Sequence, residues 1–308
     1  MKNIIILICA ALVLANCGSA DTGSAESKGK EKVPLIQPTT VKTAKQLNLT
    51  ILLDLSDRID SITNPSQPQH YQRDTILINY LTSYFIREME SKGGHMARGK
   101  MRVVFQPTPS DPNINDAAEK LKIDLSAMKP AAKKAVHDGF GNIVNENIGR
   151  IYSIPLRQSE WPGSDIWRFF KNDVTHVAID KDSSYRNVLV IFTDGYIYHD
   201  NSKDKSGNRY AYILPELLDK NKLRSRNTDV KKRIEQLDFG LITKRSDLQD
   251  LEVLVLEMTP SAGHSGDEDI IRIVLSKWFT EMKVKRWEIF NSDLPTNTMP
   301  KIDDFLRQ

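Results

Sequence analysis

Three short segments of this chain carry oxygen-bearing side chains whose types and spacing suit the binding of a hard cation. The segments are Asp54-Leu55-Ser56-Asp57-Arg58, Gly163-Ser164-Asp165 and Thr193-Asp194-Gly195. Together they offer carboxylates and hydroxyls, the oxygen ligands that Mg²⁺ prefers while it keeps several of its waters. Each segment taken singly is also a common turn or helix cap, so the chemistry depends on whether the fold brings all three together.

The elements around these segments predict that the fold does so. Apolar runs at residues 47–55 and 187–192 read as buried strands that end in the first and third segments, and a helix is expected over 164–172, directly after the second. The other expected elements are helices at 71–91, 226–237 and 270–282 and strands at 101–106, 251–258 and 287–290. Such alternation predicts a doubly wound α/β fold, with a mostly parallel central sheet and helices on both faces. Ligands of such sheets bind at the carboxyl ends of the strands.

The predicted domain spans residues 46–291, and 40% of the chain is hydrophobic, which is enough for one large core. We expect it to contain a helical insertion at about 107–160 and a hairpin at about 195–214. Residues 292–308 are predicted to form a C-terminal tail.

The order of the three segments resembles that of the von Willebrand factor A (vWA) domain family. That family binds a divalent ion in a metal-ion-dependent adhesion site built from an Asp-x-Ser-x-Ser motif, a Thr in a turn before a helix, and an Asp that often stands in Thr-Asp-Gly. The resemblance implies that Asp54, Ser56, Ser164 and Asp194 are metal ligands for Mg²⁺ or a similar divalent cation. It also implies a protein or peptide partner whose acidic residue completes the coordination.

One residue departs from the family motif: Arg58 stands where the second serine is expected. A guanidinium is always charged and only donates hydrogen bonds, so it cannot bind a metal. If Arg58 points inward, it replaces or repels the cation and pairs with Asp54 or Asp194. If it points away, Asp57 is the expected counterion, so Arg58 and Asp57 both modulate the site.

The N-terminus is typical of an exported protein. Met1-Lys2-Asn3 is positively charged, and the apolar run at residues 4–14 is shorter than the roughly 20 residues that span a bilayer. Leu14-Ala15-Asn16-Cys17 resembles the lipobox of bacterial lipoproteins, although Asn16 is larger than the usual Gly or Ala. We therefore expect a signal peptide over residues 1–16 and lipid on Cys17. The alternative is a plain secreted protein cut near Ala15.

The cysteines agree with lipidation. The chain has two, and Cys9 lies within the expected signal peptide, so the mature chain would keep only Cys17 and could form no internal disulfide. Residues 17–45 contain few large apolar side chains and are predicted to be a flexible linker between the lipid and the domain. The expected location is the cell envelope, on the periplasmic face or the cell surface.

Composition and motifs argue against several other functions. The net charge is only +3, and basic clusters have acidic residues close by, which disfavours a nucleic-acid partner. A serine hydrolase elbow at Gly263-His264-Ser265-Gly266 fails, because Asp267 replaces the final Gly and no histidine follows His264.

The sequence thus predicts a membrane-anchored binding module and not an enzyme. Two alternatives stay open. One is a metal-assisted hydrolase that uses the same carboxylates, with His199 as the nearby candidate base. The other is a scaffold with an inert rim, in which Arg58 takes the place of the metal.

Overall fold

The computed structural model describes residues 44–225, 229–260 and 263–308. The expected signal peptide, Cys17 and nearly all of the expected linker lie outside these residues. Residues Ala44–Gln308 form one compact unit.

The centre of this unit is a six-stranded sheet with the order β3-β2-β1-β4-β8-β9. The strands are β1 (Gln46–Leu53), β2 (Lys100–Phe105), β3 (Ile123–Asp124), β4 (Tyr185–Phe192), β8 (Leu251–Met258) and β9 (Arg286–Asn291). Neighbouring strands pair in parallel, except that the edge strand β3 runs antiparallel to β2. The predicted doubly wound, mostly parallel α/β fold is confirmed, and it is consistent with a vWA-like or Rossmann-like architecture.

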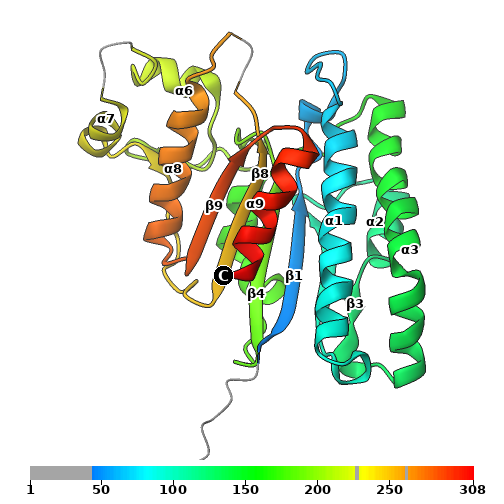
Figure 1. The fold of residues 1–308 in the computed structure, drawn as a ribbon. Helices are drawn as coiled ribbons and strands as arrows, with labels where there is room; N and C mark the ends of the chain where they lie inside the picture. The colour runs from blue at the N-terminus through cyan, green and yellow to red at the C-terminus, as the bar shows by residue number, and fades with distance from the viewer. Residues whose placement is uncertain (1–43, 226–228, 261–262) are drawn as a thin grey trace, which may run out of the picture. The chain divides into compact units, whose positions relative to one another are not determined.

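Helices cover both faces of the sheet (Figure 1). One face carries α1 (His70–Ser91), α2 (Pro112–Glu119), α3 (Pro130–Gln158) and α9 (Pro295–Arg307). The other carries α4 (Ile166–Arg168), α5 (Val174–Val177), α6 (Pro215–Lys220), α7 (Val230–Leu237) and α8 (Asp267–Glu281). A small second sheet of β5 (Lys205–Ser206), β6 (Arg209–Tyr210) and β7 (Gly240–Leu241) lies beside α8.

The continuous apolar runs follow from burial on both faces. In β1, Leu49, Ile51 and Leu53 belong to the core beneath α1 and α3, whereas Leu52 belongs to the core beneath α8. Successive side chains of a strand point to opposite faces, so a strand covered on both sides must be apolar at nearly every position.

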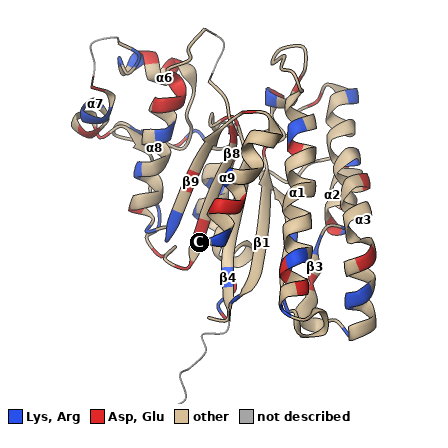
Figure 2. Cartoon of the chain, viewed as in Figure 1, with Lys and Arg blue, Asp and Glu red and all other residues tan. Residues whose placement is uncertain are grey.

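Charged side chains lie mainly on the helices and loops. Lys and Arg are interspersed with Asp and Glu along α1, α3 and α8 (Figure 2). No helix among the described residues is long and apolar enough to cross a membrane.

Three segments differ in detail from the sequence prediction. Residues 107–160 are not an insertion, because they form α2, the edge strand β3 and α3, which pack as part of the main layers. The expected hairpin reduces to the β5–β6 pair and one antiparallel bridge between Ile197 and Ile213. The expected C-terminal tail contains α9, which buries Ile302, Phe305 and Leu306 in the core.

Candidate functional site

The first and third segments meet at the centre of the sheet, where β1 and β4 are neighbours and the strand order reverses. Leu53 is in register with Phe192, so Asp54 and Thr193 emerge side by side at the carboxyl ends of these strands. Thr193 Oγ1 donates to Asp54 Oδ2 at 2.8 Å, and the backbone N–H of Ser56 donates to Asp54 Oδ1 at 2.9 Å. The Asp54 carboxylate is therefore buried and fixed in place by the two loops.

The second segment is joined to both of the others. Gly163 forms an antiparallel bridge with Leu55, and Ser164 forms one with Tyr198, four residues beyond Asp194. The Ser164 hydroxyl is buried, and it forms no hydrogen bond with any described residue. The fold thus brings together the loops of all four predicted ligands, and it leaves one of their hydroxyls without a partner.

Gly195 permits the turn that presents Asp194. Its φ is 95°, a conformation that side-chain-bearing residues rarely adopt. A Cβ placed there would lie 2.8 Å from Cγ2 of Ile271 on α8 and 3.2 Å from Cγ of Met258. Backbone conformation and packing therefore both require glycine after Asp194.

Asp194 and Asp54 act on each other electrostatically. Asp194 Oδ1 accepts the backbone N–H of Tyr196 at 3.0 Å. Burial, reinforced by the negative charge of Asp54, raises the pKa of Asp194 well above its usual value. Within the described part of the chain, neither carboxylate forms an ion pair with a basic side chain. A cation placed between them would favour the ionised form of Asp194.

Arg58 answers the question left open by the sequence. Its Nε donates to the backbone carbonyl of Asp54 at 3.1 Å, and its Nη2 pairs with Asp74 of α1. The guanidinium is buried, yet it makes no ion pair with the carboxylate of Asp54 or Asp194 among the described residues. The counterion is thus Asp74, and not Asp57, which is exposed and begins a short 3₁₀ helix.

The sequence analysis missed the buried polar cluster that receives Arg58. Asp74 Oδ2 also accepts the hydroxyl of Tyr152 from α3 at 2.7 Å. One helical position earlier, Arg73 donates to Glu257 Oε2 at the end of β8, at 2.7 Å. A signal was present in the sequence, because residues 70, 73 and 74 share the buried stripe of α1 with the apolar positions 77, 78 and 81.

His199, the candidate base of the hydrolase alternative, lies beside the second segment. Its Nδ1 is 3.7 Å from Asp165 Oδ2 and accepts the backbone N–H of Asn201 at 3.2 Å. Asp165 Oδ2 also accepts the hydroxyl of Ser202 at 2.5 Å, so the carboxylate next to Ser164 is already engaged.

The residues at the rim fit a hard cation. No cluster of three or more His, Cys, Asp or Glu side chains able to hold a metal occurs in the described ranges. The predicted ligand set is of another kind, since it combines two carboxylates with hydroxyls. A cation bound at the rim would give the Ser164 hydroxyl a partner and would offset the repulsion that Asp54 exerts on Asp194.

Comparison with known proteins found no matching family model and no matching curated protein. Two solved structures resemble the chain weakly. One is an aerotolerance-related membrane protein from Bacteroides fragilis NCTC 9343, with a TM-score of 0.36, 10% identity and coverage of 85% of this chain and 100% of that one. The other is the conserved hypothetical protein BatB from Bacteroides thetaiotaomicron, with a TM-score of 0.35, 11% identity and the same coverage. Similarity at this level identifies neither a family nor an activity, so the description of the fold rests on the chain's own strand order.

Proposed function

We propose that this protein is a binding module of the vWA type, which holds a divalent cation at the rim of its sheet and captures an acidic group of a protein or peptide through that cation. Asp54, Ser56, Ser164 and Asp194 would hold the cation directly or through water. The bound ion would supply an open coordination position for the partner's carboxylate. The proposal is for binding and includes no catalytic step.

The main support for the proposal is the hydroxyl of Ser164, which is buried and has no hydrogen-bond partner among the described residues. A buried polar atom without a hydrogen bond typically costs about 1–3 kcal/mol, so such atoms call for an explanation. Ser164 lies in the loop that is bridged to Leu55 of the first segment and to Tyr198, four residues beyond Asp194. A cation at the rim would provide the missing partner and would also relieve the repulsion between Asp54 and Asp194.

Arg58 is compatible with this role because its charge is already paired. Its guanidinium links the Asp54 backbone carbonyl to the Asp74 carboxylate of α1. The site lacks the hydroxyl that a serine at position 58 would offer. Mg²⁺ commonly keeps several waters, so a water would take that position.

The test is a calorimetric titration of Mg²⁺ and Mn²⁺ into the chelator-treated full chain. Saturable binding is expected for the wild type, with at least tenfold weaker binding in Asp54→Asn and Ser164→Ala. Asp57→Asn is the comparison variant, because it removes a charge from the same loop at an exposed position that is not a predicted ligand, and it should weaken binding much less than the ligand variants, since Asp57 acts on Asp194 only at a distance. Equal binding by all the proteins, or binding by none, would show that the rim is not a cation site.

We also propose that the domain is attached to a membrane of the cell envelope through lipid on Cys17. This rests on the charged start, the short apolar run and the resemblance of residues 14–17 to a lipobox. Feeding a labelled fatty acid to expressing cells should label the wild type and leave Cys17→Ala unlabelled. Label on the Cys17→Ala variant would contradict this attachment.

A further inference from the structure

A second polar pocket lies on the sheet, away from the rim. Its volume is about 430 Å³, and it is lined by β1, β2, the end of α2, and α5 with the segment that follows it. Asn48 of β1, which lines it, precedes Asp54 by six residues, a separation of roughly 20 Å along an extended strand. The pocket is therefore distinct from the proposed cation site, and its volume is within the usual range of roughly 300–1,000 Å³ for ligand sites.

Arg102 brings a positive charge to this pocket, which Asp180 and Glu119 also line, and Asp124 and Asp180 act on its guanidinium only at longer range. Its Nη1 donates to Thr50 Oγ1 at 3.2 Å and to the backbone carbonyl of Val177, and both of these acceptors are neutral. Among the described residues, Arg102 takes part in no ion pair. A guanidinium that is largely withdrawn from water and lacks a counterion favours the binding of an anion.

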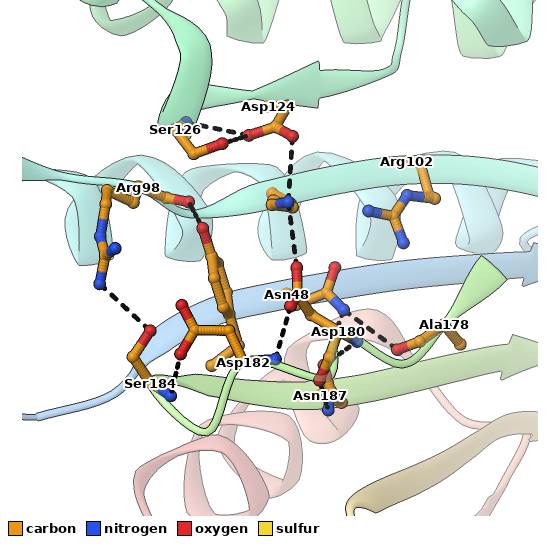
Figure 3. Close-up of polar contacts among 12 residues, drawn as sticks. Asn48, Arg98, Arg102, Asp124, Ser126, Ala178, Asp180, Asp182, Ser184 and Asn187 are labelled. Atoms are coloured by element: carbon orange, nitrogen blue, oxygen red, sulfur yellow. Dashed lines mark hydrogen bonds and ion pairs between the residues drawn. The ribbon is translucent and has the colours of Figure 1, made fainter. Parts of the chain in front are cut away.

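The neighbouring lysine differs in this respect. Lys100 lies between two carboxylates, at 3.1 Å from Asp124 Oδ2 and 3.0 Å from Asp180 Oδ2. Figure 3 shows Arg102 on the same strand, with its guanidinium free of these carboxylates. Lys100 is thus held in direct ion pairs by both carboxylates, whereas Arg102 forms none and feels them only at a distance, which leaves guanidinium donors for a ligand.

The pocket also contains a hydrogen-bond acceptor without a donor. Asn48 is buried, and its Nδ2 donates to the carbonyl of Ala178 at 3.1 Å and to Asn187 Oδ1 at 2.7 Å (Figure 3). Both of these partners are acceptors, which fixes the orientation of the amide and leaves Asn48 Oδ1 facing no donor among the described residues. A ligand N–H would satisfy it.

We propose that this pocket binds an α-carboxylate that carries a neighbouring N–H, as an N-acylated amino acid or the C-terminal residue of a peptide does. Arg102 binds the carboxylate, and Asn48 Oδ1 accepts the N–H. Lys122 and His176, which are exposed at the edge of the pocket, add donors near the carboxylate, and Lys122 lies 3.6 Å from Glu119 at the same edge. In this class of ligand, the anion and the N–H donor are held close together, as are Arg102 and Asn48 on adjacent strands.

The test is a calorimetric titration of the full chain with three probes. These are N-acetylalanine, the tripeptide acetyl-Gly-Ala-Ala with a free carboxylate, and the same tripeptide with a C-terminal amide. We expect both acids to bind saturably and the amide to bind at least tenfold more weakly. Tighter binding of the tripeptide acid than of N-acetylalanine would identify a peptide end as the ligand, and equal binding would identify a small acylated amino acid.

Variants connect the binding to the pocket. Arg102→Met should weaken binding of the acids at least tenfold, and Lys122→Gln, at an exposed position that tolerates change, should weaken it by a smaller factor. Arg98→Met is the matched control, because Arg98 is an exposed arginine near the same sheet edge that does not line the pocket. Circular dichroism would establish that each variant is folded. Binding of the amide as tight as that of the acid, no binding of either acid, or full affinity in folded Arg102→Met would overturn the proposal.

Discussion

Replacing Arg58 with methionine tests the electrostatic structure beneath the rim. The side chains of Arg58 and Asp74 are 1% and 0% exposed, so the substitution would leave a carboxylate buried without its cation. Breaking a buried ion pair in this way typically costs roughly 3–5 kcal/mol. Tyr152 still donates to Asp74, and Arg73 remains nearby, so we expect about 3 kcal/mol, at the low end of that range.

The measurement is urea-induced unfolding of the full chain, followed by circular dichroism. The variant Asp74→Leu should be destabilised by a similar amount, since it leaves Arg58 buried alone. The double variant Arg58→Met/Asp74→Leu should lose much less than the sum of the two, with a coupling of about 2 kcal/mol or more. Lowering the pH should reduce the defect of Arg58→Met, because burial already raises the pKa of Asp74 and a protonated Asp74 needs no cation.

An exposed ion pair provides the control. Lys134 and Asp138 lie 2.5 Å apart on α3, with 76% and 50% of their side chains exposed. Lys134→Met should change the free energy of unfolding by no more than about 0.5 kcal/mol, because water screens such pairs. If Arg58→Met were equally mild, or if the double variant lost the full sum of the single losses, the buried pair would not be the stabilising unit described here.

Three further substitutions test other parts of the fold. Burial, together with the charges of Arg58 and Arg73, lowers the pKa of His70 to about 4. The free energy of unfolding should therefore fall by up to roughly 3 kcal/mol as the pH drops from about 6.5 to about 4. His70→Gln should flatten this dependence when urea unfolding is compared at pH 7.5 and pH 4.5. Gly195→Ala should cost about 2 kcal/mol in the same assay, since a Cβ is excluded by both φ and packing. Phe305→Ala should cost roughly 3–5 kcal/mol, because Phe305 anchors α9 in the core.

Each of these expectations has an opposing outcome. An unchanged pH dependence in His70→Gln would mean that His70 is accessible to protons in the folded protein. A neutral Gly195→Ala would mean that the turn after Asp194 adapts to a side chain. Wild-type stability in Phe305→Ala would mean that α9 contributes little to the core.

The sequence predicted the elements whose signal is local and long. The strands β1, β4 and β8 are eight residues long and rich in apolar side chains, and α1 and α8 repeat apolar residues at helical spacing. The edge strand β3 could not be found in this way, because it has only two residues and exists through its pairing with β2. The helix α9 was missed because Pro295 and Pro300 both fall within it and proline normally argues against a helix.

The partners of the rim residues could be predicted only in part. The loops of Asp54, Ser164 and Asp194 lie together because strand order brings the carboxyl ends of β1 and β4 side by side, and strand order can be inferred from alternating elements. The partner of Arg58 cannot be inferred so simply. Asp74 and Tyr152 are 78 residues apart, and only the packing of α1 against α3 brings their side chains into contact.

The charge balance at the rim bears on what Arg58 does to the proposed cation site. Arg58 is paired with Asp74, and Arg73 is paired with Glu257, so each basic side chain in this buried cluster has an acidic partner. Asp54 and Asp194 lie outside these pairs, and their negative charges are not balanced by an ion pair in the described residues. Arg58 acts on both carboxylates at a distance and offsets part of the effect of burial on Asp194. Under the proposed function, an arginine where the vWA motif has a serine would remove one oxygen ligand and supply only part of the positive charge, and the divalent cation would supply the rest.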